Sequence, residues 1–211
     1  MIALLGAEST GKTALAGALA VALSAQPDAG PVQRVAVVSE YLREFCDLHG
    51  RTPRREEQVH IAAEQTRRIA AAAQAHDIVV ADTTALMIAV YSEQVFGDTS
   101  LYATALASHA PYDLTLLTAL DLPWQADGLQ RDGPHVREPV DAAVRSALLR
   151  ANLGYSVVCG TGNARLEAAL ACVQRAAAPP PADTDSTKRW RWHCERCGDT
   201  ACERHGLLPK A

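Results

Sequence analysis

The chain has 211 residues, of which 48% are hydrophobic and 21% charged, and its formal net charge is −4. This length can bury one sizeable core, and the small negative charge argues against a nucleic-acid-binding surface spread over the protein. No apolar run reaches the length of a membrane span, so we expect a cytoplasmic protein with reduced cysteines. Three of the six cysteines have no matching pair and are expected to be buried as small hydrophobic residues: Cys46, Cys159 and Cys172.

The first predicted elements are a short apolar strand at 1–5, a glycine-rich turn at 6–13 and a helix at 14–23. The turn reads GAESTGKT and fits G-x-x-x-x-G-K-[ST], the pattern of a phosphate-binding P-loop. Its glycines let successive backbone N–H groups point at an anion, Lys12 would reach the β- and γ-phosphates, and Thr13 would serve Mg²⁺. We therefore expect ATP and Mg²⁺ to be bound here. The residues predicted to hold them are Gly6, Glu8, Ser9, Thr10, Gly11, Lys12 and Thr13.

The rest of the chain alternates strands with helices. Further buried strands are predicted at 34–39, 77–82, 113–117 and 156–159, and helices at 41–49, 54–74, 85–96, 101–109, 140–149 and 165–176. Continuous apolar strands alternating with helices predict an α/β fold, in which helices cover both faces of a parallel sheet. Ligands of such sheets bind beyond the carboxyl ends of the strands.

Charged side chains follow the second and third predicted strands. Glu40 is suited to accept the proton of a substrate hydroxyl, and Arg43, one helical turn later, to hold phosphate or carboxylate. The same two residues also fit a helix N-terminus with a surface ion pair. Asp82 occupies the usual position of a P-loop partner that holds Mg²⁺, a role compatible with capping the next helix. Which of Glu40 and Asp82 is the base stays open.

Two loops follow the last strands. The polar loop at 123–134 and the residues after it contain Arg131 and Arg137, which we expect to form a lid that neutralises charge on a triphosphate. An ordinary solvated loop is the alternative. The segment 160–163 fits an adenine-side loop and a plain strand-to-helix turn equally well.

The segments GAESTGKT, EYLREF, ADTT and YDLTLL followed by PWQADGLQRDG resemble, in this order, the ribosylnicotinamide kinase domain of bacterial NAD-salvage proteins. That domain belongs to P-loop proteins often labelled AAA-like ATPases, although its architecture is closer to that of nucleoside and nucleotide kinases. The resemblance covers roughly residues 1–176. It implies a three-layer sandwich around a five-stranded parallel sheet. It also implies transfer of the γ-phosphate of ATP to the 5′-hydroxyl of nicotinamide riboside or a related nucleoside.

The resemblance also implies residue roles. Either Glu40 or Asp82 would be the base, with the other near Mg²⁺ or the ribose, and Arg131 and Arg137 would form the lid. The residues implied to line the nucleoside pocket are Tyr41, Arg43, Trp124 and Asp127. The alternative from another functional class is a regulatory AAA-like ATPase that works as a switch. Two carboxylates at neighbouring strand ends favour a substrate pocket over that alternative.

The main domain is predicted to span 1–178, followed by a linker at 179–187 and a Cys-rich tail at 188–211. Two closely spaced ligand pairs in the tail predict a structural Zn²⁺ site, formed by Cys194, Cys197, Cys202 and His205. His193 is an alternative ligand, and a redox CxxC pair or a disordered tail are the alternatives to zinc. Acidic residues dilute the basic and aromatic ones, so we expect protein docking or stabilisation rather than nucleic-acid binding.

Overall fold

The computed structural model describes residues 1–25, 33–125 and 133–178. Within them, five strands form one sheet in the order β2-β3-β1-β4-β5, and every pairing in it is parallel. The strands are β1 (Ile2–Leu5), β2 (Val35–Val38), β3 (Ile78–Asp82), β4 (Leu114–Thr118) and β5 (Ser156–Val158). The predicted five-stranded parallel sheet is confirmed.

The helices of this part also follow the predicted order. They are α1 (Lys12–Ser24), α2 (Tyr41–His49), α3 (Gln58–Ala75), α4 (Ala85–Phe96), α5 (Tyr102–His109), α6 (Arg137–Arg150) and α7 (Gly162–Ala177), with 3-10 turns η2 (Arg55–Glu57) and η4 (Pro134–Val136). The helix predicted from residue 54 thus begins as a 3-10 turn. The reason is local, since the Glu57 carboxylate accepts a 2.7 Å hydrogen bond from the backbone N–H of Arg54 and tightens the first turn.

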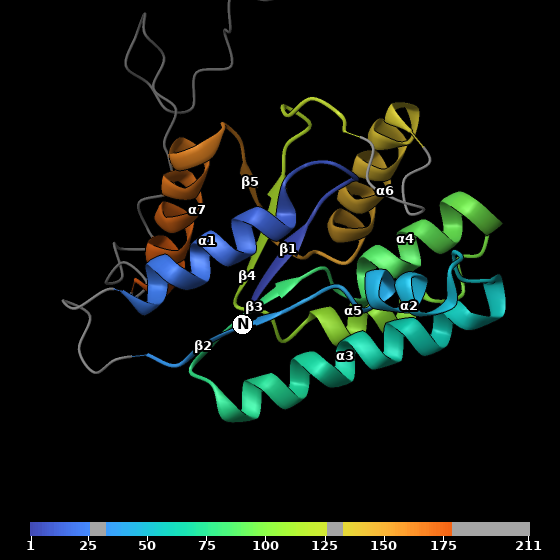
Figure 1. Ribbon diagram of the computed structural model, residues 1–211, viewed down its shortest axis with the longest axis horizontal. Helices are drawn as coiled ribbons and strands as arrows, with labels where there is room; N and C mark the ends of the chain where they lie inside the picture. Colours follow the sequence, from blue (N-terminus) through green and yellow to red (C-terminus); the bar gives the residue numbers. More distant parts are fainter. Residues whose placement is uncertain (26–32, 126–132, 179–211) are drawn as a thin grey trace, which may run out of the picture. The chain divides into compact units, whose positions relative to one another are not determined.

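Helices cover both faces of the sheet (Figure 1). On one face, Leu4 of β1 packs in a cluster with Leu19 of α1 and with residues of α7. The next residue along the strand, Leu5, points to the other face and packs with α4 and with Val144 of α6. On that second face Ile69 of α3 packs on β2 and β3. The layers are therefore helix, sheet and helix, as predicted.

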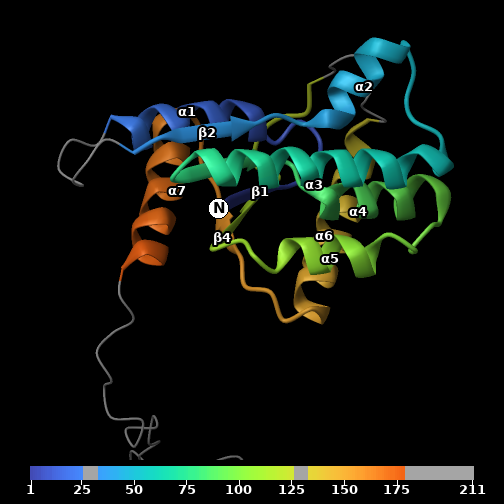
Figure 2. The same cartoon turned by 90° about the horizontal axis from the view of Figure 1, so that it is seen from below.

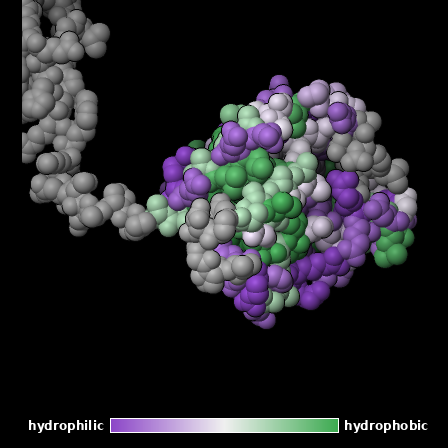
Figure 3. Space-filling view, turned by 60° about the vertical axis from the view of Figure 1, so that its left-hand side comes forward, coloured by the Kyte–Doolittle hydropathy of each residue, from purple (hydrophilic) through white to green (hydrophobic). Residues whose placement is uncertain are grey.

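The edge strands β2 and β5 are less covered than the central strands. Val37 and Val157 are 39% and 43% exposed, whereas the residues of β1 are all buried. Cys159, directly after β5, is exposed, so its predicted burial is wrong, because the last residues of an edge strand have a neighbour on one side only. Cys46 and Cys172 are buried as predicted. Figure 3 shows one face of the molecule, where hydrophobic surface gathers between hydrophilic regions.

The carboxyl ends of the parallel strands share one edge of the sheet, and α2 lies beyond the end of β2 (Figure 2). This edge is where the sequence predicts the site. Residues Met1–Ala176 form one compact unit. Across the described ranges, the structure contains no helix with the length and apolar character that crossing a bilayer requires. The predicted linker and the four predicted zinc ligands, Cys194, Cys197, Cys202 and His205, lie outside the described residues.

Candidate active site

The loop between β1 and α1 has the backbone geometry of an anion nest. Gly6 and Gly11 have φ values of 148° and 75°, and Ser9 between them has a φ of 56°. A Cβ atom at Gly6 would collide with the Thr118 hydroxyl, so both the backbone angle and the space require glycine there. Gly11 is the N-cap of α1, and the loop therefore leads directly to the positive end of that helix.

Lys12 holds its ammonium group over this loop. Its Nζ donates hydrogen bonds to the carbonyl oxygens of Gly6 and Ala7, at 2.9 and 2.8 Å. Lys12 and Thr13 both line a cavity beside the loop. The arrangement brings a cation, a helix N-terminus and a hydroxyl to one place, which is the chemistry that a polyphosphate chain requires.

Residues from distant parts of the chain brace the loop. The Thr10 hydroxyl donates to the carbonyl of Ala7 at 2.8 Å, and the Thr118 hydroxyl at the end of β4 donates to Thr10 Oγ1 at 2.7 Å. Arg165 of α7, only 4% exposed, donates to the Thr10 carbonyl at 2.7 Å and to Asp121 Oδ1 at 2.6 Å. The sequence predicted Arg165 only as the first residue of the last helix. A local sequence pattern does not reveal this role, because Thr10 and Asp121 lie 155 and 44 residues away from Arg165.

Glu40 lies at the end of β2, as the N-cap of α2, and lines the cavity. Its side chain makes no cap hydrogen bond, and an Oε2–Nη2 distance of 3.8 Å places it in an ion pair with Arg43, which also lines the cavity. The Glu40 carboxylate and the Arg43 guanidinium group therefore both lie in the wall of the cavity next to the P-loop. The ion pair of the alternative interpretation is present as well.

Asp82 ends β3 and is 2% exposed. Its Oδ1 has no hydrogen-bond partner among the described residues. A buried carboxylate oxygen without a partner is costly unless a ligand such as a cation satisfies it. Thr84, not Asp82, caps α4, since its hydroxyl accepts a 3.2 Å bond from the N–H of Leu86. The capping role considered for Asp82 is therefore wrong. Between them Thr83 lines the cavity with a φ of 81°.

Gln65 of α3 ties these two strand ends together. It is completely buried, and its Oε1 accepts a 2.7 Å bond from the N–H of Tyr41. Its Nε2 donates to the carbonyls of Ser39 and Thr83, both at 3.3 Å. One amide thus fixes the backbone on either side of Glu40 and the residue after Asp82. This role of Gln65 could not be predicted from the sequence, because a glutamine within a helix belongs to no motif.

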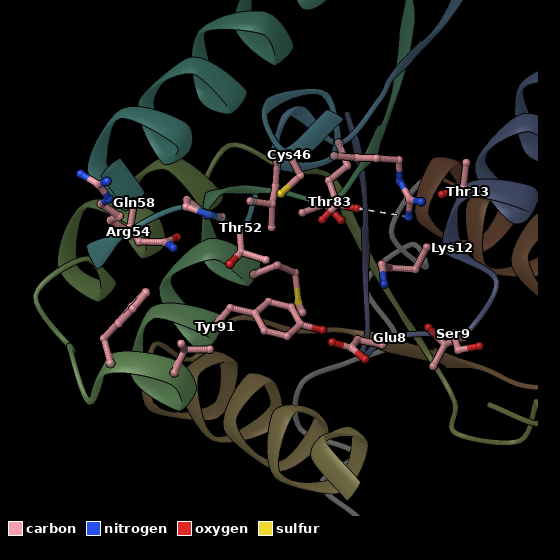
Figure 4. Close-up of a pocket in the computed structure, with 18 of the residues that line it drawn as sticks. Glu8, Ser9, Lys12, Thr13, Cys46, Thr52, Arg54, Gln58, Thr83 and Tyr91 are labelled. Atoms are coloured by element: carbon pink, nitrogen blue, oxygen red, sulfur yellow. Dashed lines mark ion pairs between the residues drawn. The ribbon is translucent and has the colours of Figure 1, made fainter. Parts of the chain in front are cut away.

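The cavity has a volume of about 730 Å³. Figure 4 shows the P-loop residues Glu8, Ser9, Lys12 and Thr13 at one end and Arg54 and Gln58 at the opposite end. The walls between them are largely apolar and come from α2 and α4: Leu42, Cys46, Met87, Tyr91, Val95 and Phe96. Burial raises the pKa of the Cys46 thiol, which keeps that wall neutral. The cavity therefore joins a phosphate-binding end to a compartment that suits an apolar ring.

Other predicted site residues lie elsewhere. Tyr41 is not among the residues that line the cavity, and its ring packs under the Arg68 guanidinium, with 4.4 Å from Cζ to the ring centroid. Trp124 precedes Gln125, whose N–H donates a 2.8 Å bond to Ser9 Oγ, so the segment after β4 lies beside the P-loop. Arg137 begins α6, is 8% exposed and does not line the cavity. Asp127 and Arg131 lie outside the described residues.

A family model described as an AAA domain matches residues 1–165. The chain belongs to the AAA domain family. This membership and the fold confirm the sequence-based assignment to P-loop proteins of the AAA-like class. No curated protein matches the sequence of this AAA domain protein.

Solved structures share the fold of this AAA domain protein. NadR in complex with NR matches with a TM-score of 0.67 at 17% identity, covering 87% of this chain and 52% of NadR. NadR in complex with NAD and AMP-PNP matches with a TM-score of 0.62 at 18% identity, with 87% and 51% covered. Thymidylate kinase from Ehrlichia chaffeensis matches with a TM-score of 0.57 at 15% identity, covering 82% of this chain and 96% of the kinase. The chain spans about half the length of the NadR chains, and it shares its fold with these NadR and thymidylate kinase structures.

Proposed function

We propose that this protein is a phosphotransferase that moves the γ-phosphate of ATP to the 5′-hydroxyl of a small nucleoside, with nicotinamide riboside as the leading acceptor. The main support for the proposal is one continuous cavity. It extends from the P-loop into the apolar compartment, and Glu40 lies in its wall. A protein that only hydrolyses ATP as a switch needs no second compartment. The folds of NadR and thymidylate kinase agree with a kinase.

In the proposed reaction, the P-loop N–H groups, Lys12 and the α1 N-terminus hold the triphosphate. Glu40 takes the proton of the acceptor hydroxyl as the oxygen bonds to the γ-phosphorus, and the bond to the β-phosphate oxygen breaks to release ADP. Asp82 and Thr13 would hold Mg²⁺, since the partnerless Asp82 Oδ1 and the Thr13 hydroxyl are oxygen donors of the kind that this ion prefers. When bound, Mg²⁺ would neutralise charge on the β- and γ-phosphates.

The division of roles between the two carboxylates follows from their surroundings. Glu40 lines the cavity and is accessible to an acceptor, which supports the role of base. Asp82 is 2% exposed and absent from the cavity wall, which supports a role on the metal. Arg43 would contact the acceptor or a phosphate. For Arg131 and Arg137 the lid stays a prediction, as does a nucleoside contact for Tyr41, Trp124 and Asp127.

Steady-state ATP turnover with and without a panel of nucleosides tests the proposal. We expect turnover that depends on a nucleoside and is lost by at least about a hundredfold in Lys12→Ala. Glu40→Gln should lower kcat by about a hundredfold or more and leave ATP affinity unchanged, because a base acts only in the chemical step. Turnover that no nucleoside alters would instead support the regulatory ATPase.

A further inference from the structure

Gln58, the first residue of α3, is a buried polar residue in the cavity wall that the proposed reaction does not use. It is 6% exposed, and its side-chain amide has no hydrogen-bond partner among the described residues. Its amide atoms are not among the fully buried side-chain atoms that lack a partner, so the amide faces the cavity and is accessible to water there. The Gln58 amide can therefore hydrogen-bond a ligand that displaces this water from the cavity.

A second glutamine on the same helix provides an internal comparison. Gln65 lies seven residues further along, so that the two side chains share one helix face. The Gln65 amide hydrogen-bonds only to backbone groups. Its Oε1 accepts from the N–H of Tyr41 at 2.7 Å, and its Nε2 donates to the carbonyls of Ser39 and Thr83 at 3.3 Å. Gln65 is thus a structural amide, whereas Gln58 presents the same chemical group to the cavity.

The location of Gln58 decides which part of a ligand it would meet. Figure 4 shows Gln58 at the end of the cavity opposite Lys12, with Cys46 and Tyr91 between them. An acceptor with its hydroxyl at Glu40 would therefore extend its far end along the apolar walls to Gln58. Those walls, which include Met87, suit a flat ring.

The backbone before Gln58 is held firmly in place. The preceding residue, Glu57, accepts bonds from both terminal nitrogens of Arg51, each at 2.7 Å, and from the N–H of Arg54. Arg55 donates a 2.9 Å bond to Asp98 after α4. A side chain that begins from such an anchored turn is oriented before any ligand arrives, which favours selective recognition.

We propose that Gln58 is a specificity-determining residue that recognises the ring end of the acceptor through an amide edge. A glutamine side chain offers a carbonyl acceptor beside N–H donors, and its complement is a group with a donor beside an acceptor. A carboxamide or a cyclic amide on a heteroaromatic ring has this pattern. A ring carboxylate does not, since one of its two acceptor oxygens would face the Gln58 carbonyl. The inference rests on the proposed nucleoside kinase function.

The test compares two acceptors that differ in one group, nicotinamide riboside with a carboxamide and nicotinic acid riboside with a carboxylate. The wild-type protein should show the higher kcat/KM for nicotinamide riboside. Gln58→Leu should lower that value by about tenfold, mainly through KM, because the contact lies far from the reacting hydroxyl. The preference between the two acceptors should shrink by the same factor. Isothermal titration of nicotinamide riboside with a non-hydrolysable ATP analogue present should show the same loss in affinity.

Two further variants complete the design. Gln74→Leu removes an exposed glutamine near the other end of α3 and should leave both acceptors unchanged. Gln58→Glu keeps the size of the side chain but replaces the amide with a carboxylate, which still accepts a bond from a ring carboxamide and repels a ring carboxylate, so the preference for nicotinamide riboside should increase. It provides the test if the leucine variant does not fold.

The outcomes separate this inference from the proposed function. An active enzyme whose preference is unchanged in folded Gln58→Leu, or does not increase in Gln58→Glu, contradicts the role of Gln58 alone. A wild-type preference for nicotinic acid riboside overturns it too. In that case the Arg54 guanidinium, which lies at the same end of the cavity, would be the group that binds the ring carboxylate. A protein that binds ATP but phosphorylates no nucleoside overturns both proposals.

Discussion

The Arg165 guanidinium of α7 donates a 2.7 Å hydrogen bond to the backbone carbonyl of Thr10 inside the P-loop, across 155 residues of sequence. The same side chain pairs with Asp121 after β4 at 2.6 Å. The buried Arg165 side chain thus connects the P-loop both to α7 and to the segment after β4. The P-loop conformation therefore depends on the last helix of the domain as well as on its own glycines.

We expect Arg165→Met to lower the free energy of unfolding by about 2 kcal/mol, because it removes charge-assisted hydrogen bonds and leaves the Thr10 carbonyl without its partner. ATP affinity should fall as well, since the loop loses a support. Denaturant unfolding and ATP titration measure the two effects. Arg67→Met is the matched control, because Arg67 pairs with Glu64 from a side chain that is 67% exposed and such pairs contribute little. Equal losses in both variants would contradict the proposed support.

The three hydrogen bonds of the Gln65 amide, here called the amide clamp, lead to a separate prediction. Gln65→Leu leaves the N–H of Tyr41 and the carbonyls of Ser39 and Thr83 unsatisfied, which should cost about 2 to 3 kcal/mol of stability. In the proposed kinase it should also lower kcat more than it raises KM for ATP, because the position of Glu40 changes. Stopped-assay kinetics together with denaturant unfolding check this. A variant that loses stability but keeps its kcat would show that the clamp serves the fold alone.

The buried position of His109 leads us to expect that the stability of the protein depends on pH. This histidine is 2% exposed between Thr84 and Thr115, and burial lowers its pKa from 6.5 to about 4. The unfolded chain therefore binds a proton between these values that the folded protein does not. Stability should fall as the pH decreases from 6.5 towards 4, by up to about 3 kcal/mol.

The measurement for His109 is urea unfolding at several pH values. His109→Gln should flatten the curve between pH 6.5 and 4, whereas His60→Gln, which removes an exposed histidine, should not. The ion-paired carboxylates of Glu57 and Asp98 have pKa values lowered to about 2, so the stability that they contribute is lost at lower pH. An unchanged slope in His109→Gln would contradict the assignment.

The Cys-rich tail predicts bound zinc. Cys194→Ser combined with Cys197→Ser removes half of the predicted ligands, so the zinc content by elemental analysis should fall from about one ion per chain towards zero. Cys159→Ser, an exposed cysteine outside the tail, should leave the zinc content unchanged. Wild-type protein purified without zinc would contradict the site.

The parts of this protein that depend on local sequence patterns could be predicted from the sequence. The P-loop, the buried strands and the positions of Glu40 and Asp82 near strand ends follow from short sequence patterns, because each lies within or close after a strand. Arg165, Gln65 and Gln58 could not be found in this way. They are ordinary helical residues, and their roles arise only when α3 and α7 pack across strand ends that are distant in sequence.

The central claim is that the cavity beside the P-loop receives a nucleoside that becomes phosphorylated. Mass spectrometry of the products, after incubation of the protein with ATP, Mg²⁺ and nicotinamide riboside, tests it most directly. We predict a 5′-phosphorylated nucleoside formed in equal amount with ADP, and neither product with Lys12→Ala. Release of ADP by the wild-type protein, with no phosphorylated product from any nucleoside in the panel, would contradict it.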